Sequence, residues 1–220
     1  MTSNDPIKEL AHIRGLMDRS TRFLSLSGLS GVVAGAVALG GAWLAHYHIS
    51  ASQGPATDVL TYGTGQGFTE ADGLLITLMT DASLVLFVAL VSAAWFTWRR
   101  TRRTGQHLWD ASARRLMINM LVPLAMGGIF CLALFYYGLP GLVAPATLVF
   151  YGIALFNASK FTLDEIRWLG LSEMALGCIA LFWLEAGLLF WAIGFGVLHI
   201  FYGGVMYLRY ERNSDAIDTV

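Results

Sequence analysis

The sequence predicts an all-α membrane protein with six transmembrane helices, arranged as three hairpins with both termini in the cytoplasm. The chain of 220 residues is 56% hydrophobic and only 13% charged, whereas soluble domains carry about 25% charged residues. Several apolar segments reach the roughly 20 residues that a helix needs to cross a bilayer. All 14 Lys and Arg residues fall on one side of the resulting topology, and the positive-inside rule makes that side cytoplasmic.

Residues 1–22 predict an amphipathic helix on the cytoplasmic surface of the membrane. A capping side chain at Asn4 or Asp5, followed by Pro6, is typical of a helix start. Five apolar residues then recur at helical spacing between charged ones: Ile7, Leu10, Ile13, Leu16 and Met17. Such a helix lies on the membrane or docks a soluble partner. The simpler alternative is a polar lead-in to the first span.

Hydropathy and turn residues divide the rest of the chain. The expected spans are 23–45, 73–98, 116–137, 141–160, 168–184 and 187–209, followed by a cytoplasmic tail at 211–220. Gly138-Leu139-Pro140 and Glu185-Ala186-Gly187 are expected as the turns of the second and third hairpins. The segment 46–71 has no basic residue and is expected as an outer loop. No cleavable signal peptide is evident, because residues 1–22 are polar and mixed in charge.

The linker 99–115 is expected to lie against anionic lipid head groups. It contains six arginines: Arg99, Arg100, Arg102, Arg103, Arg114 and Arg115. Basic residues beside a span attract anionic lipids. No nucleic-acid partner is expected, because the cytoplasmic position already accounts for these charges.

The first span carries Ser27, Gly31 and Gly35 at four-residue spacing, a pattern that lets two membrane helices approach closely. This face packs within the chain or between chains of a homo-oligomer. The surrounding pattern also recurs, because Gly28-Leu29-Ser30 with Gly35 matches Gly170-Leu171-Ser172 with Gly177. The match indicates a parallel repeat, although chance similarity between Gly-rich helices explains it nearly as well.

Three ionisable residues inside the spans are the main functional candidates: Asp81, Glu173 and His199. Intramembrane charges are costly and usually face a partner or water. Reflecting Glu173 through the turn at Glu185-Ala186 lands within one residue of His199, so the two are expected at the same depth on adjacent helices. Burial opposes their charged forms and pairing favours them, so such a pair can hold or relay a proton. The alternative is a hydrogen bond that only fixes helix packing.

Asp81 is expected about 12 Å below the outer end of its span, with no basic residue on that side to pair with it. It is either a proton or ion site or a buried neutral carboxyl. Asn119, Asn157 and Lys160 are expected near the inner surface, where they line a vestibule or cap helix ends. His46 and His48 are weak metal candidates, together with acidic residues of the outer loop. No cofactor is expected, and Cys131 and Cys178 are expected to pack as apolar thiols.

One motif raises an enzyme hypothesis. Gly28-Leu29-Ser30-Gly31 resembles the GxSG of rhomboid proteases, six-helix membrane proteins with a Ser–His dyad, and would pair Ser30 with His199. The motif stands in the first span instead of opening a fourth core helix on the opposite side, and the outer loop lacks the Trp-Arg pair of that family. Packing within the repeat explains the motif without chemistry, so no enzyme activity is expected.

Four stretches, 19–40, 114–128, 144–162 and 188–210, resemble a group of uncharacterised six-helix bacterial inner-membrane proteins. The resemblance implies a multi-pass protein of a bacterial inner membrane and carries no activity. Two function classes follow from the residues. The first is a small proton-coupled transporter or channel that uses Asp81, Glu173 and His199. The second is a non-catalytic membrane subunit or sensor that binds a cytoplasmic or membrane partner.

Overall fold

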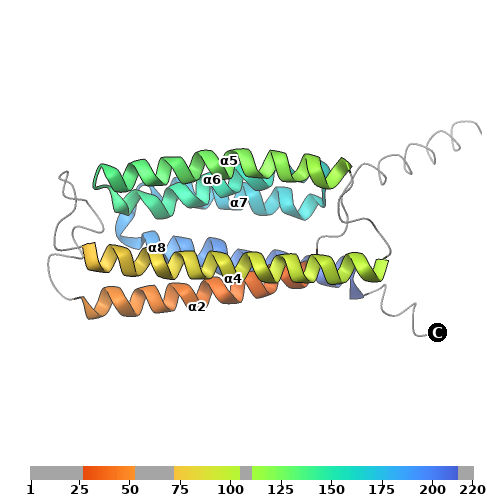
Figure 1. Ribbon diagram of the computed structural model, residues 1–220, viewed down its shortest axis with the longest axis horizontal. Coiled ribbons are helices and arrows are strands. Elements are labelled where there is room, and N and C mark those ends of the chain that lie inside the picture. The colour runs from red at the N-terminus through yellow and green to blue at the C-terminus, as the bar shows by residue number, and fades with distance from the viewer. Residues whose placement is uncertain (1–26, 53–71, 105–110, 213–220) are drawn as a thin grey trace, which may run out of the picture.

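The computed structural model describes residues 27–52, 72–104 and 111–212, and this part of the chain is helical without strands (Figure 1). The predicted amphipathic helix at 1–22 and residues 213–220 of the predicted tail lie outside the described residues.

In the described ranges, five long helices precede a composite last crossing. They are α2 (Gly28–Ala51), α4 (Asp72–Thr104), α5 (Ala111–Tyr136), α6 (Val143–Ala158) and α7 (Asp164–Ala180). The last crossing joins α8 (Gly187–Trp191), the π-helical η4 (Ala192–Leu198) and α9 (His199–Tyr210). Short 3-10 turns stand at η1 (Pro140–Leu142), η2 (Ser159–Phe161) and η3 (Leu184–Ala186).

Five segments of the described chain are long and apolar enough to cross a membrane. They are Gly28–Ala51, Gly73–Arg102, Ala111–Tyr136, Pro140–Phe161 and Leu184–Tyr210. The helix α7 has 17 residues and is about 26 Å long, close to the roughly 30 Å of a bilayer's hydrocarbon core. Its first turn carries two acidic residues, Asp164 and Glu165.

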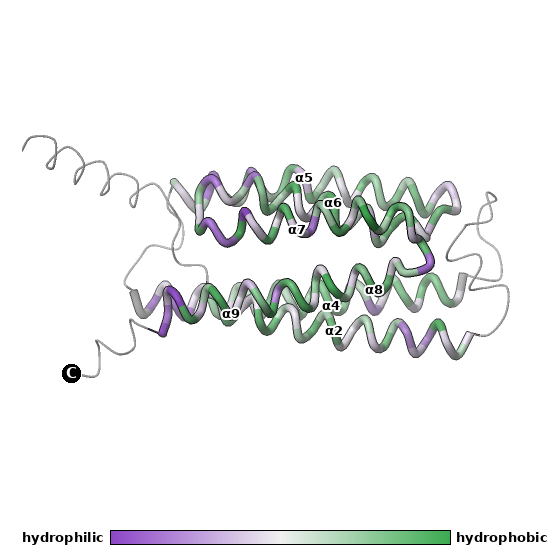
Figure 2. Tube along the Cα trace, turned by 180° about the vertical axis from the view of Figure 1, so that it is seen from behind, coloured by the Kyte–Doolittle hydropathy of each residue, from purple (hydrophilic) through white to green (hydrophobic). Residues whose placement is uncertain are grey.

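Large apolar side chains cover the outside of the molecule. Phe87, Trp95, Leu132 and Phe182 are each more than half exposed, and hydrophobic residues follow one another along most of each helix (Figure 2). A water-soluble monomer rarely exposes apolar patches of this extent. The described chain is therefore that of an integral membrane protein.

The helices form two layers that lie along the same axis (Figures 1 and 2). One layer holds α5, α6 and α7, and α6 packs extensively on both of its neighbours. The other layer holds α4, α2 and the α8–α9 crossing, with α2 in the middle. Packing between the layers is sparser, and it runs mainly from α6 and α7 to α8, η4 and α9.

The last pair of helices differs from the expected hairpin. The helices α2 and α4 pack together, as do α5 and α6, but α7 packs mainly on α6 instead of on α8–α9. Glycines explain this arrangement. A Cβ atom placed on Gly152 would lie 2.7 Å from the Gly170 carbonyl oxygen, so the backbones of α6 and α7 approach too closely for a side chain.

The Gly31/Gly35 face packs within the chain. A Cβ on Gly31 would lie 3.2 Å from the Cα of Gly203, and one on Gly35 would lie 2.6 Å from the Gly196 carbonyl oxygen. Both partners belong to the η4–α9 segment, which α2 contacts extensively. The two copies of the Gly-Leu-Ser pattern thus stand at the closest helix contacts, α2 on α9 and α7 on α6.

Helix ends differ from the expected spans, because hydropathy marks the apolar part of a helix and not its hydrogen-bonded ends. The predicted outer loop at 46–71 is wrong at its start, since α2 continues to Ala51. At the other end of the bundle α4 continues to Thr104 through four of the arginines. The fifth helix begins at Asp164 and ends at Ala180, four residues earlier than the span expected at 168–184.

Candidate functional site

Glu173 and His199 meet where the two layers face each other. Glu173 comes from α7 in one layer and His199 from the first turn of α9 in the other. The His199 Nδ1 lies 3.4 Å from the Glu173 Oε1, and the Glu173 side chain is 0% exposed. The proximity that hairpin geometry predicted is present in the structure.

Both nitrogens of His199 are engaged. Its Nδ1 lies 3.0 Å from the carbonyl oxygen of Gly194, and since a carbonyl only accepts, Nδ1 carries a hydrogen and donates it. Its Nε2 lies 2.8 Å from the hydroxyl oxygen of Tyr151 on α6. In the neutral ring Nε2 accepts from Tyr151, and in the imidazolium ring it donates to Tyr151.

The carboxyl of Glu173 is enclosed without a conventional hydrogen bond. Neither of its oxygens has a hydrogen-bond partner among the described residues, so the 3.4 Å contact with His199 is its principal polar interaction. A buried carboxylate needs a compensating charge or donor. One proton shared by the pair has two stable places, on the carboxyl with a neutral imidazole or on the imidazole beside a carboxylate.

The π-helical segment η4 shapes the site. A π-turn bonds residues five apart, and here it brings the Gly194 carbonyl to His199. Gly194 also makes room for the carboxyl, because a Cβ at this position would lie 2.5 Å from the Glu173 Oε2. The Gly-Phe-Gly sequence at 194–196 suits an irregular turn, since glycine relaxes the steric limits on the backbone. Departures of this kind frequently mark functional positions in helices.

Aromatic rings surround His199 in this site. Trp191, Phe195 and His199 follow at four-residue intervals, with ring centroids 5.0 Å and 5.9 Å apart. Tyr151 lies against Phe195 and His199, at 4.9 Å and 5.4 Å. These rings exclude water from the imidazole and hold its plane.

Asp81 has a partner that the sequence did not suggest. The Nδ1 of His48 on α2 lies 2.8 Å from the Asp81 Oδ2 on α4, and the two side chains are 29% and 14% exposed. The expectation that Asp81 lacks a basic partner is therefore wrong. It failed because the apolar run ends near Ala45, whereas the helix continues and carries His48 to the α4 contact.

Among the described residues, His46 and His48 do not belong to a metal site. His46 is exposed on α2, His48 is bound to Asp81, and the described residues contain no group of three potential metal ligands. Of the acidic residues considered with them, Asp58 and Glu70 lie outside the described part, and Asp72 is the first residue of α4.

The three candidates for an inner vestibule do not come together. The Asn119 amide donates to the Arg115 carbonyl oxygen of its own helix at 2.8 Å, and Lys160 is exposed. No hydrogen bond links Asn119, Asn157 and Lys160 within the described ranges.

Ser30 does not bond to His199 in the described structure. Its hydroxyl donates to the Ser27 carbonyl oxygen at 2.6 Å, while Gly194 and Tyr151 occupy the nitrogens of His199. The arrangement gives no support to a Ser–His dyad.

Two carboxylates that the sequence reasoning missed tie helix ends together. Glu165 of α7, 6% exposed, accepts from the Arg209 Nη1 at 2.9 Å and from the Tyr210 hydroxyl at 3.1 Å. Glu211 accepts from the Ser27 hydroxyl, the Gly28 amide and the Arg100 guanidinium. Glu211 therefore caps the start of α2 and joins it to the end of α4. Ser27, which was expected to pack helices together, takes part in this polar contact instead.

Different signals would have found the missed residues. Thr162 and Glu165 have capping-box spacing, which indicates a helix start ahead of Trp168. Nothing in the sequence links Tyr151 to His199, because hairpin reflection relates only neighbouring spans.

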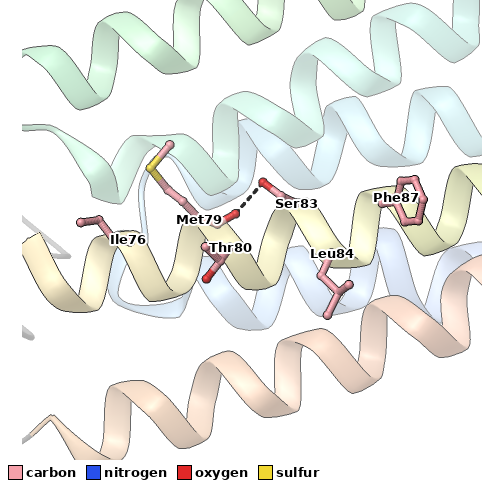
Figure 3. Close-up of a pocket in the computed structure, with 6 residues that line it drawn as sticks. All are labelled: Ile76, Met79, Thr80, Ser83, Leu84 and Phe87. Atoms are coloured by element: carbon pink, nitrogen blue, oxygen red, sulfur yellow. Dashed lines mark hydrogen bonds between the residues drawn. The ribbon is translucent and has the colours of Figure 1, made fainter.

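The groove drawn in Figure 3 lies on the outer surface of α4. Its six lining residues all come from that helix: Ile76, Met79, Thr80, Ser83, Leu84 and Phe87. The hydroxyls of Thr80 and Ser83 donate to backbone carbonyls of α4 itself. The groove offers no charged group and belongs to the lipid-facing surface.

No protein-family model, curated protein or solved structure matches this chain. The function is therefore argued from its own residues.

Proposed function

We propose that the chain is an integral protein of a bacterial inner membrane that conducts protons across it, as a channel or as part of proton-coupled transport. The observation that carries the proposal is the Tyr151–His199–Glu173 chain, in which three protonatable groups from three helices are in contact inside the bundle. The proposal accounts for a costly buried carboxyl that has no conventional hydrogen-bond partner among the described residues.

The size of the site favours a proton over a larger ion or solute. The Glu173 side chain is 0% exposed, and Leu148, which is also fully buried, lies beside it at Gly194. A solute would require the layers to separate, whereas a proton moves along existing contacts by exchanging donors and acceptors.

The contacts support a balanced transfer. Starting from a Glu173 carboxylate, Tyr151 gives its hydroxyl proton to Nε2 as it receives another proton from a hydronium ion on its far side, and Nδ1 gives its proton to Glu173. One proton has then moved from the hydronium ion to Glu173, which leaves a water molecule, a neutral carboxyl and the other tautomer of the imidazole. Release from Glu173 and return of the imidazole to its first tautomer complete the cycle.

The ends of the helices support an orientation in the membrane. The arginines of α4 lie at the end of the bundle where α9 finishes, since Arg100 bonds to Glu211 at 3.1 Å. The guanidinium of Arg102 lies 4.1 Å from the centroid of the Trp98 ring, a pairing suited to the membrane interface. We infer that this end faces the cytoplasm and contacts anionic head groups, and that both termini are cytoplasmic.

A second candidate function is a membrane subunit without transport. The observation that favours it is α4, which packs substantially on α2 alone and leaves most of its apolar surface uncovered. A partner helix or a second copy of the chain would fit this surface as readily as lipid does.

Proton flux in sealed liposomes tests the proposal. A pH gradient with a counter-ion path should drive flux through the wild type well above that of empty liposomes. Glu173→Gln keeps the shape of the side chain and removes its proton exchange, so its flux should fall at least about tenfold.

Asp81→Asn is the matched control. It removes another carboxyl that pairs with a histidine but lies about 20 Å along the axis from the site by helix rise. Its flux should stay within about twofold of wild type, because no step of the transfer involves it. Wild-type liposomes that carry no more protons than empty ones would contradict the proposed function.

A further inference from the structure

We propose that Glu165, held by Arg209 and Tyr210, is a second proton-binding station on the same path, placed between the Glu173–His199 pair and the cytoplasm. The inference rests on the proposed function and adds a residue to it. Glu165 is nearly as enclosed as Glu173, with 6% of its surface exposed, although it stands in the first turn of α7 near the expected inner surface.

The two glutamates belong to one face of α7. Both are among its buried residues, and eight residues separate them, which is about 12 Å of helix rise. Both also face the last crossing, where Glu173 meets His199 and Glu165 meets Arg209 and Tyr210. The same pair of elements therefore carries a buried carboxylate at mid-depth and another at its inner end.

An apolar cluster separates the two carboxylates. Its buried members are Leu155, Leu163, Ile166, Leu169 and Met206. Along α7, Ile166 and Leu169 stand between Glu165 and Glu173, and along α9, Met206 stands between His199 and Arg209. A packed apolar layer of this kind excludes water and blocks free conduction.

Tyrosine hydroxyls bracket this cluster. Tyr151, Tyr202 and Tyr210 all pack against it. The first bonds to His199 and the last to Glu165. The Tyr202 hydroxyl lies 3.4 Å from the hydroxyl of Ser172, which is next to Glu173 on α7. Polar groups therefore stand on both sides of the apolar layer, with His199 and Glu173 on one side and Glu165 on the other.

The partners of Glu165 suit a group that exchanges protons with the inner solution. The Arg209 side chain is 68% exposed, so the ion pair opens to water on one side. Tyr210 donates to both carboxylate oxygens at 3.1 Å and faces the apolar cluster on the other side. A proton arriving along the seam between α7 and α9 therefore meets Glu165 before it reaches solvent.

Chemical rescue by formate distinguishes a proton-binding role of Glu165 from a purely structural role, in which Glu165 only holds α7 against α9. In proteoliposomes, Glu165→Ala should lose at least about tenfold in proton flux, and formate added on the inner face should restore it in a dose-dependent manner. Glu173→Gln at the same formate concentrations is the control. It measures the proton flux that arises when formic acid itself crosses the membrane, independently of Glu165. If formate raises flux no more in Glu165→Ala than in Glu173→Gln, the station is refuted.

Two further variants distinguish a loss of proton exchange at Glu165 from a loss of structure. Arg209→Gln breaks the ion pair and keeps the carboxylate, so it should retain at least about a third of wild-type flux. If Glu165 had only a structural role, Arg209→Gln would be as defective as Glu165→Ala. Glu165→Gln preserves side-chain volume and should conduct poorly while eluting as a folded protein. Wild-type flux in Glu165→Gln would overturn the inference and leave the proposed function intact. Absence of flux in the wild type would overturn both.

Discussion

The hydroxyl of Tyr151 is the group whose removal changes the site least while breaking the chain of proton donors. Tyr151→Phe keeps the ring against Phe195 and His199 but leaves Nε2 of His199 without its partner. The lost hydrogen bond should cost about 1 kcal/mol of stability, and proton flux should fall at least about tenfold. Flux in liposomes beside thermal unfolding in detergent measures both effects. Flux equal to wild type would remove Tyr151 from the path.

The His48–Asp81 pair is expected to act on stability alone. It joins α2 to α4 at 2.8 Å, and both side chains keep some contact with solvent. Asp81→Asn and His48→Gln should therefore each lower the free energy of unfolding by no more than about 1 kcal/mol. A double-mutant cycle on unfolding measures the coupling. A large loss of flux in either single variant would instead place the pair on the conduction path.

At the scale of the element, the π-helical segment is expected to set the geometry of the carboxyl. Gly194→Ala places a methyl group 2.5 Å from the Glu173 Oε2 and also against the Leu148 side chain, so the carboxyl must shift from its present position. Flux should fall at least about tenfold, because proton transfer depends steeply on donor–acceptor geometry. Gly204→Ala is the matched control, since a Cβ there meets no atom within 4 Å. Equal flux in the two variants would contradict the role of η4.

The contact between α2 and α9 gives a prediction about the fold. Gly35→Leu forces a side chain against the Gly196 carbonyl and the Ile200 amide, which are 2.6 Å and 3.0 Å from a Cβ at this position. We expect loss of folded monomer, because overpacking a backbone contact typically costs about 1–3 kcal/mol. Gly40→Leu, where a Cβ has nothing within 4 Å, should fold normally. Size-exclusion profiles in detergent compare them. A folded Gly35→Leu that differs only in oligomeric state would show that this face joins chains.

At the scale of the whole molecule, hydropathy was sufficient to predict the apolar helices of the described chain, although not their ends. The short turn between two neighbouring spans was sufficient to predict one side-chain contact. Glu173 and His199 could be paired because a short turn joins their segments. His48 could not be paired with Asp81, because the apolar run stops before the helix does. Tyr151 and Glu165 depend on how α6 and α7 face α9, and glycine contacts distant in sequence determine that packing.

The two layers also explain why the polar contacts matter together. Contacts between the layers are fewer than those within each layer, and the polar contacts Tyr151–His199, Glu173–His199 and Glu165–Arg209 all cross from one layer to the other. The site therefore both joins the layers and carries the chemistry. A test must separate the two roles.

The most direct test replaces the pair by apolar residues and asks whether conduction survives. Glu173→Leu combined with His199→Phe removes a buried polar pair, an exchange that is often neutral or stabilising. We expect a folded protein at least as stable as wild type, with proton flux no greater than that of empty liposomes. A folded double variant that conducts protons as the wild type does would show that the pair only holds helices together.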